Sequence, residues 1–331
     1  MSTARAAVRD RYGPPEIVEL TEVETPVPTG DQVLVRVHAA SLNRADLDGL
    51  YPRWQFMRAF SGLRRPRERG LGLDAAGVVE ATGPDVTRLA PGDAVFADLF
   101  AFGQGAFADY VCAPERAFQP IPSSLGFEEA STLPHSAVLA LQALRLRNGR
   151  TIRAGDRVLI EGASGNVGPF AVQIAKLMGA EVTGVARGDK LDFVRSLGAD
   201  HVIGYGDVDY TTTGERYDWI VAADAHHSLL ASSRALTRTG AYVALGGSAG
   251  WMLSSALVTP TIRLASGRFA GLLLWWKPFH VPDVDRLREL VESGAVKPAI
   301  DRTYPLEQVV DALRYLDEGH PRGKVVLTMG R

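Results

Sequence analysis

Three glycines, Gly162, Gly165 and Gly168, stand at three-residue spacing directly after the apolar run Val158–Ile160. Glycine permits the positive φ of a tight turn and lets a pyrophosphate approach the backbone, because no Cβ stands in the way. The spacing G-x-x-G-x-x-G matches the dinucleotide-binding fingerprint in its context but not letter for letter. We therefore expect a nucleotide cofactor to bind at Gly162, Ala163, Ser164, Gly165, Asn166, Val167 and Gly168.

The elements that must position this turn follow from a change in hydrophobic period. Val158–Ile160 is typical of a strand buried on both faces. From Val167 to Met178 apolar residues recur three and four apart, which predicts a helix with one buried face that ends near Gly179. Glu181–Val185 is then expected to form the next parallel strand. The free N–H groups at the helix start would attract the anion.

The residues after the second strand bear on which nicotinamide cofactor is bound. NAD-binding units usually place an acid here to accept from the ribose 2′-OH, but this chain has Arg187, with Lys190 three residues later. These cations can pair with a 2′-phosphate, which an acid would repel, so we expect NADPH. Two alternatives stay open. Asp189 takes the discriminating position if the strand ends later, or Arg187 and Lys190 belong to a solvated loop.

Composition limits the class of protein. A chain of 331 residues that is 46% hydrophobic has room for two domains with cores of ordinary size. Its 36 basic and 38 acidic residues give a net charge of −2, which argues against a nucleic-acid or membrane partner. The longest apolar run, Phe269–Trp276, is too short to span a bilayer. The first residues lack an apolar signal core and Cys112 has no partner for an internal disulfide, so we expect a cytoplasmic protein.

The pattern of elements changes along the chain. From Ala4 to about Ser123 it predicts mainly strands and turns, for example at Val33–Val37 and Ala75–Ala81. From Phe127 strands alternate with helices, as in a doubly wound parallel sheet. A helix is expected at 283–293, and the end of the chain returns to short elements. The fold class is therefore α/β, with a mainly β domain followed by a doubly wound domain.

One segment has a strong local charge bias. Six arginines lie between Arg53 and Arg69, around Trp54 and Phe56. The segment is either an exposed, solvated loop, or a lid over the substrate or a seat for a phosphate-bearing acyl carrier.

Several blocks in the right order resemble the zinc-independent quinone oxidoreductase branch of the medium-chain dehydrogenase/reductase superfamily, the group that includes zeta-crystallin. Beside the glycine turn, they are Ser41–Asp46, Gly72–Glu80, Pro91–Asp93, Gly105–Val111, Leu197–Asp200 and Arg322–Val326. The resemblance covers essentially the whole chain. It implies a GroES-like β-rich catalytic domain over 1–123, completed by 298–331, and a Rossmann dinucleotide-binding domain over 124–297.

Zinc-dependent members of the superfamily have a Cys at the position of Asn43, Gly-His-Glu at Gly72–Asp74, and a lobe with four clustered cysteines. With one cysteine and seven scattered histidines, no tetrahedral zinc cage can be assigned from this sequence. The pair His226–His227 is better explained as part of a surface or a loop. Without a metal to polarise an isolated ketone, the expected acceptors are conjugated: quinones, enones or enoyl thioesters.

The resemblance also implies roles for single residues. The nicotinamide would face the β-rich domain in the interdomain cleft, near Asn43. His135 falls where the zinc branch has another cysteine, so it would stabilise or protonate a developing oxyanion, or else only pack near a helix start. Tyr205 is implied beside the 2′-phosphate, and Gly246 and Gly247 are implied at the carboxamide. A threonine that is common in the family is replaced by Leu139, and Asp46 and Asp74 are expected to fix loops through hydrogen bonds.

The function expected from these observations is an NADPH-dependent oxidoreductase that transfers hydride to a small conjugated carbonyl or quinone without zinc. The alternatives are a reductase of enoyl thioesters or biosynthetic intermediates, and a non-catalytic NADPH-binding structural or sensor protein. In the family the edge of the nucleotide-binding sheet pairs across a two-fold axis. The apolar segment Phe269–Trp276 therefore predicts a homodimer.

Overall fold

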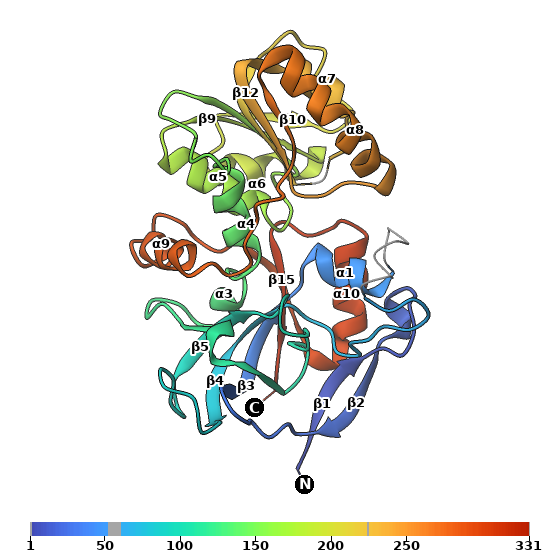
Figure 1. The fold of residues 1–331 in the computed structure, drawn as a ribbon, viewed down its shortest axis with the longest axis vertical. Helices are drawn as coiled ribbons and strands as arrows, with labels where there is room; N and C mark the ends of the chain where they lie inside the picture. Colours follow the sequence, from blue (N-terminus) through green and yellow to red (C-terminus); the bar gives the residue numbers. More distant parts are fainter. Residues whose placement is uncertain (1, 52–60, 224, 331) are drawn as a thin grey trace. The chain divides into compact units, whose positions relative to one another are not determined.

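The computed structural model describes residues 2–51, 61–223 and 225–330 (Figure 1). The chain forms two compact units. Unit 1 comprises Met1–Val138, Pro278–Ser293 and Pro298–Arg331, and unit 2 comprises Leu139–Lys277 and Gly294–Lys297. Within the described residues, no helix is both long enough and apolar enough to cross a membrane.

Unit 1 is built around a sheet with strand order β14-β15-β3-β4-β5-β7, and β6 pairs with β3. β1 and β2 form a separate antiparallel pair. The strands are β1 (Thr3–Val8), β2 (Glu19–Glu24), β3 (Gln32–Ser41), β4 (Asp74–Thr82), β5 (Ala94–Asp98), β6 (Tyr110–Pro114), β7 (Phe118–Pro120), β14 (Ile300–Pro305) and β15 (Lys324–Thr328). The helices are α1 (Arg44–Leu50), α3 (Phe127–Ser131), α9 (Val281–Glu292) and α10 (Val309–Asp317), and α4 (Ser136–Ala143) begins in this unit.

The register of this sheet brings polar strand ends together. Ser41, the last residue of β3, pairs with Asp74, the first residue of β4, and Asp74 pairs with Asp98 at the end of β5. On the other side Ser41 pairs with Val326 of β15, two residues after Lys324. The adjoining core is apolar and contains Leu42, Leu47, Leu71, Leu99 and Phe107, all fully buried. A cluster of polar side chains thus lies at one end of the sheet against an apolar core.

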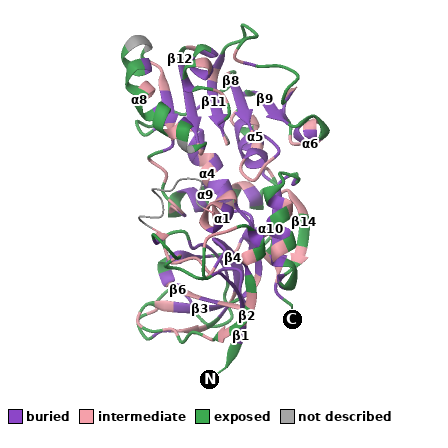
Figure 2. Cartoon of the chain, turned by 90° about the vertical axis from the view of Figure 1, so that its right-hand side faces the viewer, coloured by how far each residue is buried: buried purple, intermediate pink, exposed green. Residues whose placement is uncertain are grey.

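Unit 2 is a six-stranded parallel sheet with order β10-β9-β8-β11-β12-β13, as expected of a Rossmann fold. The strands are β8 (Arg157–Glu161), β9 (Glu181–Ala186), β10 (His201–Gly204), β11 (Tyr217–Ala222), β12 (Leu236–Ala244) and β13 (Phe269–Leu272). The helices are α5 (Gly168–Leu177), α6 (Leu191–Ser196), α7 (Leu229–Arg234) and α8 (Ala249–Ser266). Strand order reverses between β8 and β11, and these central strands are buried (Figure 2). Ligands of such sheets bind beyond the carboxyl ends of the strands at this reversal.

Candidate active site and cofactor site

The glycine turn of unit 2 joins β8 to α5. Gly162 has a φ of +73°, and its carbonyl accepts from the Gly165 N–H at 3.0 Å. A Cβ on Gly168 would lie 2.2 Å from the carbonyl oxygen of Gly162, so only glycine fits where the turn enters the helix. Pro169 occupies the first turn of α5, where its missing N–H costs nothing. The turn at 162–168 therefore fits the pyrophosphate of a dinucleotide, with the N–H groups of the first helical turn available to hold it.

Arg187 is the first residue after β9 and carries the expected cation. It does not stand alone, because Nε and Nη2 donate to the two carboxylate oxygens of Asp189 at 2.5 and 2.9 Å. Both side chains are about half exposed, and the guanidinium lowers the pKa of Asp189 to about 2. The strand ends before Arg187, so Arg187 takes the position after the strand and Asp189 acts as its counter-ion.

The other expected cofactor residues of unit 2 follow neighbouring strands. The backbone N–H of Tyr205, after β10, donates to Ala186 at the end of β9 at 2.8 Å. Gly246 and Gly247 follow β12 and pair with Ala225. Lys190, expected to pair with the 2′-phosphate together with Arg187, lies in the turn before α6 and is only 4% exposed, so the alternative of a solvated loop does not hold for it.

A second polar group, at the end of β8, was not identified from the sequence. Glu161, the last residue of β8, is fully buried, and one of its oxygens lies 4.0 Å from Nε2 of His227. Nδ1 of His227 lies 3.7 Å from Asp209, and its ring packs edge-on against Tyr210. Burial, followed by the influence of Glu161, raises the pKa of Tyr210. His226 and His227 do lie in a loop, as the sequence suggested, but His227 also contacts buried groups.

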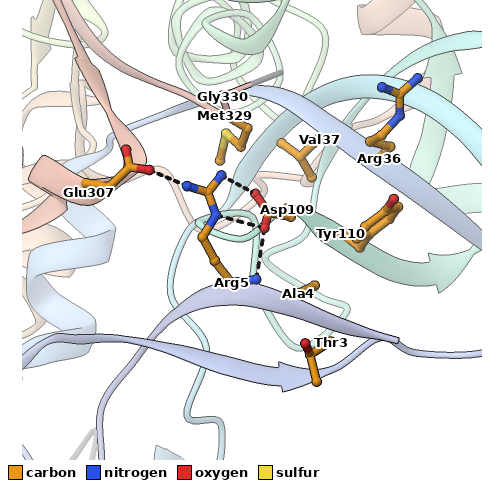
Figure 3. A pocket seen from close by; sticks show the side chains of 10 residues that line it. All are labelled: Thr3, Ala4, Arg5, Arg36, Val37, Asp109, Tyr110, Glu307, Met329 and Gly330. Carbon is orange, nitrogen blue, oxygen red and sulfur yellow. Dashed lines mark hydrogen bonds and ion pairs between the residues drawn. The ribbon is translucent and has the colours of Figure 1, made fainter. Parts of the chain in front are cut away.

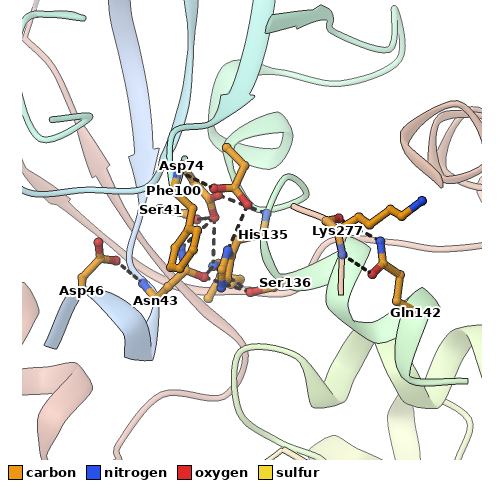
Figure 4. Close-up of polar contacts among 11 residues, drawn as sticks. Ser41, Asn43, Asp46, Asp74, Phe100, His135, Ser136, Gln142 and Lys277 are labelled. Carbon is orange, nitrogen blue, oxygen red and sulfur yellow. Dashed lines mark hydrogen bonds and ion pairs between the residues drawn. The ribbon is translucent and has the colours of Figure 1, made fainter. Parts of the chain in front are cut away.

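Asp74 is the centre of the polar cluster in unit 1 (Figure 4). Its Oδ2 accepts from the Ser41 hydroxyl at 2.9 Å and from Asn43 Nδ2 at 2.8 Å. Its Oδ1 accepts from the backbone N–H of His135 at 3.1 Å. All four residues are buried, and burial raises the pKa of Asp74. Asp74 therefore joins the two residues that were expected to be catalytic, Asn43 and His135.

The imidazole of His135 is fixed by Asp98, a residue that the sequence did not single out. Nδ1 lies 3.0 Å from Asp98 Oδ2, so Nδ1 is the donor and Nε2 points away from this carboxylate. The other oxygen of Asp98 accepts from the Phe100 N–H at 2.9 Å. Burial alone would lower the pKa of His135, but the carboxylate of Asp98 outweighs it and the pKa lies above its ordinary value. Asp98 therefore favours the doubly protonated form of His135.

The amide of Asn43 is held from both sides. Its Oδ1 accepts from Lys324 Nζ at 2.7 Å and from the Ser136 hydroxyl at 3.0 Å, while Nδ2 donates to Asp74. Lys324 belongs to the block Arg322–Val326, from which the sequence alone indicates no role for this side chain. The orientation of the amide is therefore set by its neighbours.

Asp46 stabilises the start of α1. Its Oδ2 accepts from the Asn43 backbone N–H at 2.7 Å, which is half of a capping box. Burial raises the pKa of Asp46 to about 7, although this hydrogen bond opposes the rise. The expectation that Asp46 and Asp74 fix loops through hydrogen bonds is confirmed.

Unit 1 also contains an open pocket of about 590 Å³. Figure 3 shows Arg5 at its centre, bound to Asp109 at 2.7 and 3.0 Å and paired with Glu307. None of the expected site residues lines it; its lining residues are Thr3, Ala4, Arg5, Arg36, Val37, Asp109, Tyr110, Glu307, Met329 and Gly330. The ion pairs of Arg5 therefore stabilise the neighbourhood of β1 rather than offer an unpaired charge.

A metal centre is not assembled in the part of the chain that the structure describes. No group of three or more His, Cys, Asp and Glu side chains there is arranged to hold a metal ion. The expected segment of arginines lies partly outside the described residues, which resume at Ser61.

Two family models match the chain. The alcohol dehydrogenase GroES-like domain matches residues 29–123, and the zinc-binding dehydrogenase domain matches residues 197–327. The first match falls in unit 1, and the second covers parts of both units.

Known proteins are similar over almost the whole chain. The mitochondrial NAD(P)H oxidoreductase RTN4IP1 of Mus musculus is 31% identical over 98% of this chain and 89% of its own length. The chloroplast envelope quinone oxidoreductase homolog of Arabidopsis thaliana is 30% identical, over 94% of this chain and 93% of its own length. The solved quinone oxidoreductase of Coxiella burnetii is 30% identical, with a TM-score of 0.87 and 99% of both chains covered. The chain therefore belongs to the medium-chain dehydrogenase/reductase superfamily of oxidoreductases, with quinone oxidoreductases among its relatives.

Proposed function

We propose that this protein is a reductase that transfers hydride from NADPH to a small conjugated acceptor, a quinone or an enone, and that it does so without zinc. The observation that carries the proposal is the buried Asp98–His135 pair, joined through Asp74 to Asn43. It offers a positioned proton donor in a family of oxidoreductases.

The chemistry needs one hydride and one proton. NADPH, when bound, supplies the hydride and both electrons. His135 would supply the proton from Nε2 to the oxygen on which negative charge develops. Asp98 holds Nδ1, stabilises the imidazolium and fixes the direction of Nε2. A quinone or enone spreads the arriving charge over a conjugated system, so such a proton donor is sufficient where an isolated ketone would need a stronger electrophile.

The preference for NADPH is supported by the end of β9. Arg187 follows the strand directly, where an NAD-specific unit would carry an acid. Its partner Asp189 is exposed, and exposed ion pairs are weak, so a 2′-phosphate would compete well for the guanidinium. Tyr205 would lie beside the same group because its backbone is bonded to the end of β9.

The test is the oxidation of NADPH and of NADH by the purified protein, followed by loss of nicotinamide absorbance with a benzoquinone, an alkenal and an enoyl thioester as separate acceptors. We expect turnover with the quinone or the alkenal and faster turnover with NADPH. Binding of NADPH without turnover of any conjugated acceptor would refute the catalytic proposal and favour a non-catalytic sensor.

A variant pair assigns the chemistry to the site. His135→Gln removes the proton donor and should lower kcat about 100-fold or more. The matched control is His201→Gln, because His201 is an exposed histidine paired with Glu181 in unit 2. Equal activity of the two variants would contradict the role of His135.

A second candidate is a reductase whose substrate carries a phosphate-bearing handle, such as an enoyl thioester of coenzyme A. This candidate is favoured by three exposed arginines, here called the arginine cluster: Arg64, Arg65 and Arg67. Within the described residues no carboxylate lies within ion-pair distance of the three, whereas the nearby Arg69 is paired with Asp10 at 2.5 Å.

The loop that carries the arginine cluster is fixed by hydrogen bonds. The Tyr12 hydroxyl donates to the Gly62 carbonyl at 2.8 Å, and the Arg67 N–H donates to the Ser61 carbonyl at 2.8 Å. These hydrogen bonds hold the backbone of the loop, and the exposed guanidinium groups that it carries are of the kind that binds phosphate.

A further inference from the structure

Lys324 is the first residue of β15, and its side chain is only 1% exposed. Lysine is rarely fully buried, because its ammonium group then loses its hydration. Here Nζ donates to Asn43 Oδ1 at 2.7 Å and to the Ser136 hydroxyl at 3.1 Å, and it lies 3.5 Å from Asp74 Oδ2. The ammonium group is therefore both hydrogen-bonded and paired with a carboxylate.

These contacts decide whether a zinc ion fits the same place, as the name of the matched dehydrogenase family would imply. Zinc needs about four ligand atoms whose free lone pairs converge on one point. Asn43 Oδ1 already accepts two hydrogen bonds. Both oxygens of Asp74 also accept, from the Ser41 hydroxyl and the His135 N–H among others, and Nδ1 of His135 faces Asp98. The lone pairs of these atoms already accept hydrogen bonds from donors of the protein, or the atom is itself a donor, as Nδ1 is. These side chains therefore do not form a zinc site.

The cluster contains groups of both signs. Buried carboxyl groups of Asp46, Asp74 and Asp98 lie near the buried Lys324 and His135. Burial raises the pKa of Asp74, and Lys324 is the main influence against that rise. Burial likewise lowers the pKa of Lys324, and Asp74, Asp46 and Asp98 oppose it. The charge of Lys324 thus favours the ionised form of Asp74, and Asp74 favours that of Lys324.

We propose that Lys324 takes the place of a metal ion in this site and acts as a positioning residue. Its ammonium group turns the Asn43 amide so that Nδ2 faces Asp74, and it supplies the positive charge that lets Asp74 hold the His135 backbone as a carboxylate. The inference concerns the arrangement of the site, and it rests on the proposed function only for what the site then catalyses.

The test compares thermal unfolding of the native protein and Lys324→Met at about pH 5.5 and about pH 7.5, without substrate. Methionine keeps the apolar stem and removes the charge. Loss of the charge raises the folded-state pKa of Asp74, Asp46 and His135, all of which Lys324 lowers in the native protein. A group whose pKa is raised by folding stabilises the protein at low pH and loses that contribution as the pH rises through the folded pKa. The variant should therefore lose more stability at the higher pH.

We expect the difference in Tm between native protein and variant to be roughly 2 °C or more larger at the higher pH. An equal loss of Tm at both pH values would mean that only the packing of the stem matters, and it would overturn the inference. The matched control is Lys297→Met, an exposed lysine, which should leave Tm unchanged at both pH values.

A second measurement needs no Lys324 variant and therefore holds even if that variant does not fold. Native protein and His135→Gln are incubated with zinc, desalted and analysed for bound metal. We expect both proteins to retain the same amount, well below one ion per chain. Stoichiometric zinc that the native protein retains and His135→Gln loses would overturn the inference. Neither measurement uses a hydride acceptor. Both therefore test the role of Lys324 even if the protein proves to reduce no quinone and the proposed function fails.

Discussion

The pair of Arg187 and Asp189 makes cofactor preference open to a direct test. In the structure Nε and Nη2 of Arg187 each donate a hydrogen bond to one carboxylate oxygen of Asp189. Binding of NADPH would exchange this exposed carboxylate for the 2′-phosphate, whereas NADH offers Arg187 no such group. The informative changes are Arg187→Ala, which removes the cation, and Asp189→Asn, which leaves the cation and removes its competitor.

The magnitude follows from the exposure of the two side chains. A charge-assisted hydrogen bond is worth about 1.5–3 kcal/mol, but Arg187 is half exposed and gives up an existing partner, so about 1–2 kcal/mol remains. That corresponds to a rise of about 5- to 30-fold in KM for NADPH in Arg187→Ala. The KM for NADH should change by less than about twofold. Asp189→Asn should act in the opposite direction and lower the KM for NADPH about two- to fivefold, because a negative charge beside the phosphate is removed.

The assay is steady-state oxidation of each cofactor at a saturating concentration of one acceptor, with KM and kcat determined separately. Arg195→Ala is the matched control, because Arg195 is an exposed arginine that pairs with Asp192 at 2.5 Å in the following helix. It should leave both KM values unchanged. The reasoning fails if Arg187→Ala raises KM for NADH as much as for NADPH, or if Asp189→Asn weakens NADPH binding.

Three further predictions concern the proton donor, the substrate handle and assembly. If His135 is the acid, kcat should fall as the pH rises through the pKa of His135, which lies above its ordinary value. The variant Asp98→Asn removes the carboxylate that raises this pKa, so the alkaline limb of its pH profile should move to lower pH. An unmoved limb would exclude His135 as the acid. Replacing the arginine cluster with alanines should raise KM about tenfold for an enoyl-coenzyme A thioester and not for a free quinone, and equal effects on both would reject recognition of a phosphate. Among the described strands β13 pairs only with β12, and three leucines of α8 are 70–92% exposed: Leu253, Leu257 and Leu264. We therefore expect light scattering to show a homodimer for the native protein and a monomer for Leu257→Asp. A monomeric native protein would refute this prediction.

The sequence predicted the parts of the structure that depend on short-range pattern. The change from strand to helix around Gly162–Gly168 is local, and β8, α5 and β9 form where the hydrophobic period indicates. The polar cluster is different, because Asn43, Asp98 and Lys324 meet only through the register of β3, β4, β5 and β15. A lone aspartate at a strand end and a lysine at a strand start look solvated in a sequence. Only the packing shows that they are buried.

Two further differences concern local features of unit 2. Lys190 lies three residues after Arg187, and the sequence predicted that both pair with the 2′-phosphate, but Lys190 falls in the turn before α6 and is buried there. The sequence does not predict the helix α8, because Pro260 interrupts the pattern and several leucines face solvent, so no clear amphipathic period remains. Its start is nevertheless well formed, since the Ser248 side chain accepts from the Trp251 N–H.

The exchange of a metal for an ammonium group has consequences for the chemistry of the site. A metal ion with an open position polarises a substrate oxygen directly. The ammonium of Lys324 is instead surrounded by Asn43, Ser136 and Asp74, so its hydrogen bonds are directed at the protein and its charge acts mainly through the groups that it holds. In the proposed mechanism the acid is the imidazole of His135, whose pKa is raised by Asp98. An imidazole acid suits an acceptor that already delocalises the added charge, and for that reason we propose quinones and enones rather than isolated ketones as substrates.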